Sequence, residues 1–536
     1  MDGDFDYVIV GAGSAGCVLA NRLTADGRFR VLLIEAGGSD LRPWVQVPIG
    51  YGMAFHDGRI NWKYTTEPVP GLGGRTSYWP RGKVLGGSSS INAMVYVRGH
   101  RQDFDDWAAA GADGWGWDGV APYFQRMEAW AGGDDPARGR DGPLAIEPIE
   151  GRAHGLCDTW LDGTAEAGIA ETPDYNGAQM DGAFRYQLTT RGGFRASTAR
   201  CYLRPARRRA NLAVVTGAQV MRLGTERQVT YRRAGRTHEV RARRDVILSA
   251  GAVNSPQLLM LSGLGPGAAL QAHGIVPKRD LPAVGQHMQD HLGVDIHYRS
   301  RVRTLNEELR PWLGRIKAAM RYAVDRRGPL SLSVNQGGGF VRLDEGEGAP
   351  NQQLYFSPVS YTRARAGKRA LMSPDPFPGF LIGFSACRPT SRGAVTLSSA
   401  DPMAPPAIQP NYLATNRDRA EALQGMRLLR RIAETTAFQQ VIESEISPGP
   451  EAVSDEALLA HIRDTAWTVF HPCGTCRMGT DPATSVVDPH LRVHGIPGLR
   501  VVDASVFPNV TSGNINAPVI MVAERAADLI LEDARR

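Results

Sequence analysis

The first stretch able to do chemistry is Gly11-Ala12-Gly13-Ser14-Ala15-Gly16, which has the spacing GxGxxG. Glycines at these positions permit a tight turn and let backbone N–H groups approach a pyrophosphate at the positive end of the following helix. Glu35 lies nineteen residues beyond Gly16, where a carboxylate can accept hydrogen bonds from ribose hydroxyls. A glycine-rich turn in an unrelated βαβ unit is the alternative. The full spacing favours a dinucleotide site, without distinguishing NAD from FAD.

A second stretch of small residues extends from Pro80 to Met94 and contains Gly86-Gly87-Ser88-Ser89-Ser90. So many small residues together predict backbone that lies flat against a large planar or extended ligand. A flexible linker is the alternative. However, the apolar and β-branched run from Ile91 to Val97 follows at once, which is not typical of a linker.

A third stretch near the C-terminal end combines a predicted strand, Leu499 to Val502, with Asp503 directly after it. Residues 514–518, Asn-Ile-Asn-Ala-Pro, then open a helix whose apolar positions fall on one stripe. Pro518 suits the first helical turn, so Asn516 and its neighbours lie at the positive end of this helix. Such an end can stabilise negative charge on a reduced cofactor ring.

The elements that must position these stretches follow the order strand, glycine turn, helix and strand. The two strands are Phe5 to Val10 and Arg30 to Ile34, with a helical pattern between them. Leu212 to Val215 and Asp245 to Gly251 predict further strands of the nucleotide-binding sheet. Residues 297–469 alternate strand-like runs with helices, which indicates a sheet with helices on one side that serves as a substrate or lid domain.

Length and composition restrict the class of protein. A chain of 536 residues is too long for one hydrophobic core, so at least two domains are expected. The net charge of +6 comes mostly from scattered arginines, which argues against nucleic acid as a partner. Six cysteines make no disulfide framework, and no apolar stretch is long enough for a transmembrane helix. Since the first strand leaves no room for a leader, we expect a cytoplasmic protein, and peripheral contact with the inner membrane stays open.

Four motifs in the same order resemble those of the glucose–methanol–choline (GMC) oxidoreductase family, flavoproteins that oxidise alcohols. They are Gly82 to Asp105, Gly251 to Gly265, His471 to Gly479 and Asn514 to Pro518. The resemblance runs over essentially the whole chain. Within the family it is strongest to the bacterial choline dehydrogenase and aliphatic alcohol dehydrogenase branch, which also shares segments 79–83 and 95–100.

The resemblance implies FAD as the cofactor, with Glu35 on the adenosine ribose, Val220 against the adenine and Asp503 near the ribityl chain and pyrophosphate. The cofactor-binding residues that it implies are Gly11, Gly13, Ser14, Ala15, Gly16, Glu35, Ala36, Trp62, Arg81, Val84, Gly86, Gly87, Ser89, Asn92, Ala93, Met94, Val95, Val220, Asp503, Ala504, Asn514, Asn516, Ala517 and Pro518. Some relatives attach FAD covalently through a histidine two residues after the paired serines. Ile91 stands at that position here and cannot form the bond, so we expect non-covalent FAD.

The resemblance also implies an α/β fold (α+β overall) of the GMC architecture, in which a Rossmann-like FAD-binding domain is joined to a mixed-sheet substrate-binding domain. The FAD-binding domain is expected to be discontinuous and to comprise residues 1–155, 196–296 and 470–536. The substrate-binding or lid domain is expected to comprise residues 156–195 and 297–469. The chain would therefore leave the cofactor domain twice and return to complete the site.

The chemistry of alcohol oxidation supports the roles that the resemblance implies for His471 and Asn516. An alcohol must lose its O–H proton and a hydride from the adjacent carbon, and the flavin takes the hydride. Because a histidine is the natural proton acceptor near neutral pH, we assign that role to His471 and expect Asn516 to hold the substrate oxygen beside it. A loop histidine whose hydrogen bonds go to the backbone is the alternative.

Other polar residues receive structural interpretations. Cys473 and Cys476 have the C-x-x-C spacing of a redox dithiol or half a zinc site, but no second cysteine pair lies nearby and we expect no metal. His287 and His291 are interpreted as structural hydrogen-bonding residues. Close relatives carry a glutamate where this chain has Gln336, and the loss of that charge favours neutral alcohols over choline.

Three functions stay open at this point. The leading hypothesis is an FAD-dependent alcohol dehydrogenase that passes electrons to a quinone, a cytochrome, a dye or another acceptor. A close alternative is an oxidase that uses oxygen and releases hydrogen peroxide, since the reactivity of a flavin with oxygen depends on the shape and charge of its cavity. The third is a lyase that keeps FAD as a non-redox group. Neither the alcohol nor the oligomeric state follows from the sequence.

Overall fold

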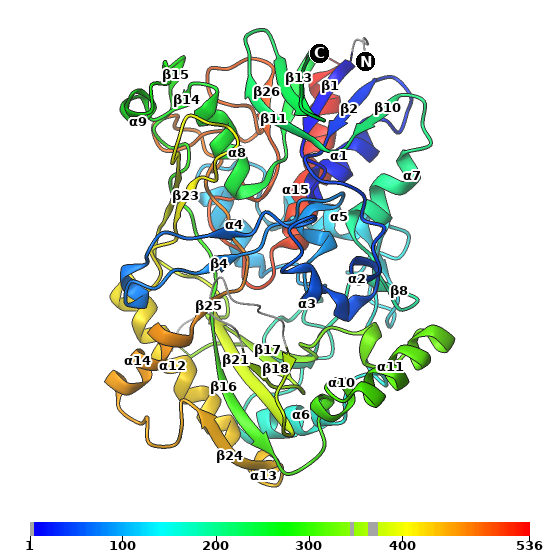
Figure 1. Cartoon of the computed structure of the whole chain (residues 1–536), viewed down its shortest axis with the longest axis vertical. Coiled ribbons are helices and arrows are strands. Elements are labelled where there is room, and N and C mark those ends of the chain that lie inside the picture. Colours follow the sequence, from blue (N-terminus) through cyan, green and yellow to red (C-terminus); the bar gives the residue numbers. More distant parts are fainter. Residues whose placement is uncertain (1–4, 344–347, 363–372, 536) are drawn as a thin grey trace.

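The computed structural model describes residues 5–343, 348–362 and 373–535. Two sheets of seven strands lie at opposite ends of its long axis (Figure 1). β1 and β26, which come from the first and the last part of the described chain, both belong to the first sheet. The predicted combination of a Rossmann-like domain with a second, sheet-containing domain is confirmed.

The first sheet has the strand order β10-β2-β1-β13-β12-β11, and β26 pairs with β13. Its strands are β1 (Phe5–Val10), β2 (Val31–Ile34), β10 (Leu212–Val215), β11 (Ala218–Leu223), β12 (Gln228–Arg233), β13 (Arg236–Leu248) and β26 (Leu499–Val501). β10, β2, β1, β26 and the C-terminal part of β13 run parallel, while β11 and β12 extend the sheet as antiparallel strands. The parallel strands are rich in β-branched residues because helices and loops cover both of their faces.

Three helices connect and cover this sheet. α1 (Ser14–Leu23) joins β1 to β2 in the crossover that parallel strands require, and α8 (Gly251–Leu261) follows β13. α15 (Asn516–Asp533) packs directly against α1, so the last helix of the chain lies beside the first. The apolar side of the helix predicted for residues 519–530 faces this core: Val522, Ala526 and Ile530 are buried.

The second sheet has the strand order β24-β16-β21-β18-β17-β7, and β25 pairs with β16. Its strands are β7 (Gly182–Arg185), β16 (Leu292–Ser300), β17 (Gly337–Val341), β18 (Gln352–Ser357), β21 (Gly379–Ala386), β24 (Ile442–Ser447) and β25 (Trp467–Thr468), and their pairings are antiparallel. The helices around it are α6 (Leu156–Glu166), α12 (Asn416–Ala433), α13 (Thr436–Gln439) and α14 (Asp455–Thr465).

The remaining elements are short or lie between the two sheets. The helices are α2 (Pro43–Gln46), α3 (Tyr51–Ala54), α4 (Arg101–Ala109), α5 (Trp117–Met127), α7 (Arg204–Ala206), α9 (Gly267–Ala272), α10 (Leu305–Leu309) and α11 (Trp312–Asp325). The strands pair two by two: β3 (Tyr64–Thr65) with β4 (Tyr78–Trp79), β5 (Glu128–Trp130) with β6 (Leu144–Ile146), β8 (Thr190–Arg191) with β9 (Phe194–Arg195), β14 (Leu264–Gly265) with β15 (Arg279–Asp280), β19 (Tyr361–Thr362) with β20 (Ser373–Pro374), and β22 (Ala394–Thr396) with β23 (Ala407–Gln409). Among the described residues, every helix is too short or too polar to pass through a bilayer.

One boundary of the predicted domain division falls inside a strand of the second sheet. This boundary, between residues 296 and 297, falls inside β16, whose whole length pairs with strands of the second sheet. We therefore propose that the second segment of the substrate-binding domain begins at or before Leu292, with the other predicted boundaries kept. The chain passes between the sheets several times, and the space between them holds the cavity described next.

Candidate active site

A cavity of about 1160 Å³ is lined by residues that belong to both sheets and to the loops between them. Its size exceeds the roughly 300–1,000 Å³ typical of small-molecule pockets, which suits an extended cofactor together with a substrate. The predicted site residues that line it are Gly11, Gly13, Ser14, Ala15, Glu35, Ala36, Trp62, Arg81, Gly87, Asn92, Ala93, Met94, Val95, Val220, His471, Asp503, Ala504, Asn514 and Asn516. Residues that the sequence had not indicated also line it, among them Ser249, Ala250 and Val253 after β13.

Six predicted cofactor residues lie behind the wall of the cavity instead of on it: Gly16, Val84, Gly86, Ser89, Ala517 and Pro518. Their contacts support the wall. The Gly86 N–H donates to the carbonyl of Ala12 at 2.7 Å, and the Ser89 hydroxyl donates to the carbonyl of Gly86 at 2.6 Å. A Cβ at Gly16 would lie 1.9 Å from the Gly11 carbonyl oxygen, so only glycine fits there.

One end of the cavity is built from two glycine turns in direct contact. Gly11 has a φ of +100° and lies against the Ser249 carbonyl, and Gly87 has a φ of +53°. A Cβ on Gly87 would lie 2.6 Å from the Cα of Gly13, so both turns need glycine to approach each other. α1 begins at Ser14 with no side-chain cap at Gly13, which leaves the N–H groups of its first turn available to an anion such as a phosphate.

Glu35 holds the glycine turn from the tip of β2. Its carboxylate accepts hydrogen bonds from the N–H of Ala12 at 2.9 Å and from the N–H of Gly37 at 2.7 Å. Burial raises the pKa of this carboxyl to about 7, although the two backbone N–H groups oppose the shift. The carboxylate oxygens keep further lone pairs that a ribose hydroxyl can use.

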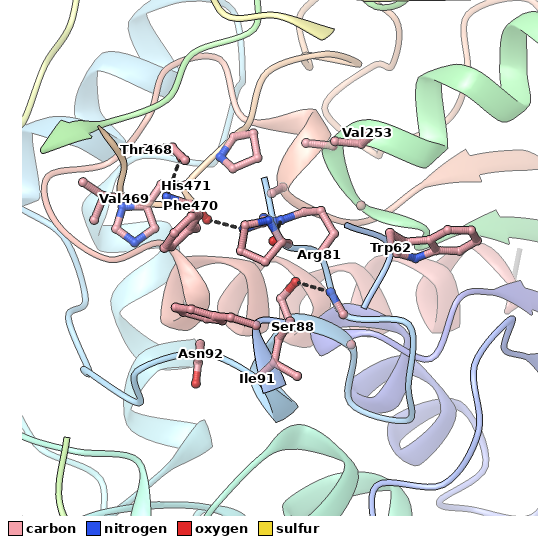
Figure 2. Close-up of a pocket in the computed structure, with 18 of the residues that line it drawn as sticks. Trp62, Arg81, Ser88, Ile91, Asn92, Val253, Thr468, Val469, Phe470 and His471 are labelled. Carbon is pink, nitrogen blue, oxygen red and sulfur yellow. Dashed lines mark hydrogen bonds between the residues drawn. The ribbon is translucent and has the colours of Figure 1, made fainter. Parts of the chain in front are cut away.

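The other end of the cavity contains His471, which Figure 2 shows beside Phe470 and Arg81 and facing Ile91 and Asn92. His471 Nδ1 lies 2.9 Å from Nδ1 of His291, whose Nε2 lies 2.9 Å from the carbonyl oxygen of Cys387. A carbonyl oxygen only accepts, so His291 must carry its proton on Nε2. Its Nδ1 then accepts from His471 Nδ1–H, and Nε2 of His471 is left unprotonated.

Burial keeps both imidazoles neutral. It lowers the pKa of His291 to about 4, and it lowers the pKa of His471 well below 6.5, with His291 and the cation of Arg81 adding to the effect. Asn514 Nδ2 lies 3.1 Å from Nε2 of His471 and donates to it. His471 therefore presents an unprotonated nitrogen to the cavity at neutral pH.

The structure places Asn514 and Asn516 against different partners. Asn514, not Asn516, lies against His471, and its amide oxygen accepts from Nε2 of Gln353 at 3.2 Å. Asn516 lines the cavity as the first residue of α15, and its amide oxygen accepts from the Ser14 hydroxyl at 2.8 Å. Since Asn516 has already entered the helix, its side chain points toward α1, whereas Asn514 in the preceding loop reaches the histidine.

A buried carboxylate anchors the loop that carries His471. Asp290 accepts from the backbone N–H of His471 at 2.7 Å, from the Thr468 hydroxyl at 2.6 Å and from the Tyr412 hydroxyl. Burial raises the pKa of Asp290 to about 6, and these donors oppose the shift. The sequence offered one signal for this anchor: Asp290 directly precedes His291, a histidine that was interpreted as a structural hydrogen-bonding residue.

The C-x-x-C pair lies in the buried core of the first domain. Cys473 and Cys476 are buried free thiols, and burial raises the pKa of each. In the part of the chain that the structure describes, no cluster of three or more histidine, cysteine or carboxylate side chains can hold a metal ion. Both thiols pack in the core beneath the cavity.

Aromatic rings form a connected wall beside His471. Tyr51 contacts Phe55, Phe55 contacts Phe470, and Phe470 contacts Trp467, with ring centroids 5.3–5.9 Å apart. Gln336 lies outside this wall: its amide oxygen accepts from the His154 N–H at 2.7 Å, and it does not line the cavity. The four aromatic side chains and His471 line the same cavity.

Comparison with known proteins gives consistent results. The family model for the N-terminal part of GMC oxidoreductases matches residues 5–293, and the model for the C-terminal part matches residues 389–523. The chain is 41% identical to an alcohol dehydrogenase [acceptor] of Pseudomonas putida, with 98% of this chain and 96% of the relative covered. It is 41% identical to an oxygen-dependent choline dehydrogenase of Photobacterium profundum, with 99% and 94% covered. Among solved structures, pyridoxine 4-oxidase of Mesorbium loti superposes with a TM-score of 0.87 at 34% identity, covering 98% of this chain and 99% of that one.

Proposed function

This chain belongs to the GMC oxidoreductase family, its cofactor is FAD and it acts on CH–OH donors, and on that premise we propose that it oxidises a neutral primary or secondary alcohol to the aldehyde or ketone. We further propose that the electrons pass to a quinone or another acceptor. The observation that carries the proposal is the neutral His471, whose unprotonated Nε2 faces the cavity.

The residues at the glycine-turn end fit the nucleotide part of FAD. The uncapped first turn of α1 can hold the pyrophosphate, and the Glu35 carboxylate can accept from the ribose. Asn92 and the residues after it would lie along the ring system, where Ile91 offers no atom for a covalent bond. When bound, FAD supplies the acceptor for the hydride of the alcohol carbon.

The residues of the other end would handle the proton. A hydroxyl bound between His471 and Asn514 donates to Nε2 of the histidine and accepts from Nδ2 of the amide. The direct contact between these two nitrogen atoms is then replaced by their contacts with the substrate oxygen. Gln353 holds the amide oxygen of Asn514 and keeps its N–H groups turned toward the histidine. His291 accepts from Nδ1–H and fixes the tautomer in which Nε2 is the base.

The aromatic wall supports an apolar alcohol as the substrate. Tyr51, Phe55, Phe470 and Trp467 exclude water from the space beside His471 and offer dispersion contacts to a carbon chain or ring. Because Gln336 does not reach the cavity, it supplies neither a charge nor a hydrogen bond to a substrate there. The charge at position 336 therefore does not bear on the substrate, and the proposal of a neutral aliphatic or aromatic alcohol over choline rests on the aromatic wall alone.

The test is anaerobic mixing of the holoenzyme with aliphatic, aromatic, polyether and sugar alcohols and with choline. The absorbance of the oxidised flavin is recorded after each addition. Bleaching by neutral alcohols, with choline slower, is the expected result. If no alcohol bleaches the flavin, the redox proposal fails and a lyase with a non-redox flavin becomes the better assignment.

An oxidase is the second candidate, because pyridoxine 4-oxidase and formate oxidase from Aspergillus oryzae RIB40 are among the similar solved structures. The two functions differ in the fate of the electrons. Oxygen uptake with the best alcohol is expected to be much slower than reduction of a quinone analogue or dye. Oxygen uptake at a rate that matches dye reduction would make the protein an oxidase.

A further inference from the structure

Helix α11 (Trp312–Asp325) is bound to the rest of the protein by very little of its surface. Ala318 and Tyr322 are its buried residues. Its exposed large apolar side chains are Trp312 (70% exposed), Leu313 (54%), Ile316 (45%), Met320 (56%) and Val324 (87%). These five residues, here called the apolar stripe, contribute nothing to the core. They account for much of the large apolar side-chain surface that the described residues expose.

The apolar stripe is continuous along the helix. With about 100° between successive residues, its members fall within an arc of about 120°, and Ala318 lies on the opposite side. Arg315 borders one edge of the arc, and Lys317 and Arg321 border the other edge. An exposed apolar arc with cations on both edges is the pattern of a helix that lies in the plane of a membrane surface.

The attachment of α11 leaves this stripe directed outward. Tyr322 donates from its hydroxyl to the carbonyl of Gly193 at 2.8 Å, and the guanidinium of Arg326 lies over the rings of Tyr322 and Phe194. α11 otherwise packs on α10 and on the short turn Pro329–Ser331. Figure 1 shows α10 and α11 projecting from the side of the molecule, next to the second sheet.

The charge of this segment complements an anionic surface. Residues 310–327 contain six basic side chains and one acidic side chain, Asp325, and all seven are exposed. Across the described ranges, none of the six cations is tied in an ion pair. Their long apolar stems can lie along a bilayer while the charged ends reach the phosphate groups of lipids.

We propose that α11 is a docking surface for an anionic lipid bilayer, with the apolar stripe inserted among the headgroups. The protein then lies on the membrane by one helix face and does not cross it. This inference is independent of the proposed function, although it would bring the enzyme to the layer in which a lipid-soluble electron acceptor is dissolved.

The experiment is flotation of the holoenzyme with vesicles of phosphatidylcholine alone or of phosphatidylcholine mixed with phosphatidylglycerol. Wild-type enzyme is expected to float with the anionic vesicles at low salt and to be released at high salt. The double substitution Ile316→Glu and Met320→Glu should lower the bound fraction by at least about tenfold, because it removes two apolar side chains from the lipid.

The matched control is Val276→Glu with Val453→Glu, which makes the same change of charge at apolar residues that are 80% and 72% exposed elsewhere. This control should float like the wild type, and both variants should reduce a soluble dye at the wild-type rate, which shows that they are folded. A third variant, Lys317→Gln with Arg321→Gln, should retain less of the salt-sensitive binding.

Three results would overturn the proposal. One is no flotation of the wild type on anionic vesicles. Another is an equal loss of binding in the control variant. The last is a concentration-dependent dimer in light scattering that the Ile316→Glu, Met320→Glu variant abolishes while vesicle binding is absent, which would make α11 a contact between two copies of this chain.

Discussion

The two ends of the cavity are built in different ways. The glycine-turn end uses backbone: Gly11, Gly13 and Gly87 bring two turns into contact, and the first turn of α1 is left uncapped. The other end uses side chains from segments far apart in the sequence, since His471 meets His291 and Asn514. A site of the first kind can be recognised from a local motif, whereas a site of the second kind depends on the whole fold. Substitutions at the two ends should therefore have different effects: those at the glycine-turn end should weaken FAD binding, and those at the other end should slow flavin reduction.

The largest effect is expected at the side-chain end. His471→Ala removes the base, and the rate of flavin reduction by alcohol should fall by about 10²–10⁴-fold with FAD still bound. Stopped-flow reduction under anaerobic conditions measures the rate, and the flavin absorbance of the purified protein measures the FAD content. If the variant lost FAD and kept its rate per bound flavin, the assignment of FAD binding to one end and of proton transfer to the other would be wrong.

The two asparagines provide a matched pair for the second test. Asn514→Ala should slow flavin reduction by about 10²–10³-fold, because it removes a donor to the substrate oxygen. Asn516→Ala removes the hydrogen bond with Ser14 at the start of α15 and should change FAD retention more than the rate. The same stopped-flow and absorbance measurements apply to both. The opposite pattern would return the role beside His471 to Asn516.

The glycine end should respond through cofactor affinity. Gly87→Ala places a Cβ 2.6 Å from the Cα of Gly13, and strain of about 1–3 kcal/mol would weaken FAD binding by up to about 100-fold. Gly27→Ala is the control, because Gly27 also has a positive φ, +78°, but a Cβ there meets nothing within 4 Å. Titration of the apoprotein with FAD measures both affinities. Equal weakening in the two variants would show that contact between the turns does not matter.

The smallest effect is expected from pH. Because burial holds the pKa of His471 well below 6.5, its base form is present above that value and is lost only as the pH falls through the lowered pKa. The rate of flavin reduction should change by less than about twofold between about pH 7 and 8. Single-turnover measurement separates this rate from FAD loss, which Glu35 can influence since its pKa is about 7. A rate that rises steeply across that interval would mean that Nε2 starts out protonated.

The elements that the sequence predicted well are those whose pattern is local. β1, β2 and the start of α1 follow from one apolar run, one glycine turn and one helical stripe, and the structure confirms them within a residue or two. Of the strand-like runs predicted within residues 297–469, the one that forms β22 (Ala394–Thr396) pairs with β23, outside the second sheet. A strand pattern indicates an extended segment and does not identify its partner.

The part of the site that could not be predicted depends on where one element ends. Asn514 and Asn516 are equivalent in the motif, and only the start of α15 at Asn516 decides which side chain reaches His471. The role of His291 likewise required the carbonyl of Cys387, a residue nearly a hundred positions away, because that contact fixes the tautomer. Neither fact leaves a local sequence signal.

The placement of β26 and α15 has a consequence for how the protein is made. β13 pairs with β1 on one side and with β26 on the other, and α15 packs on α1, so elements from the two ends of the chain complete one sheet and one helix pair. During synthesis, the first sheet lacks β26 and the cavity lacks Asn514 until residues 499–533 have left the ribosome. A nascent chain that has released only its N-terminal part would therefore carry the glycine motif without a finished site.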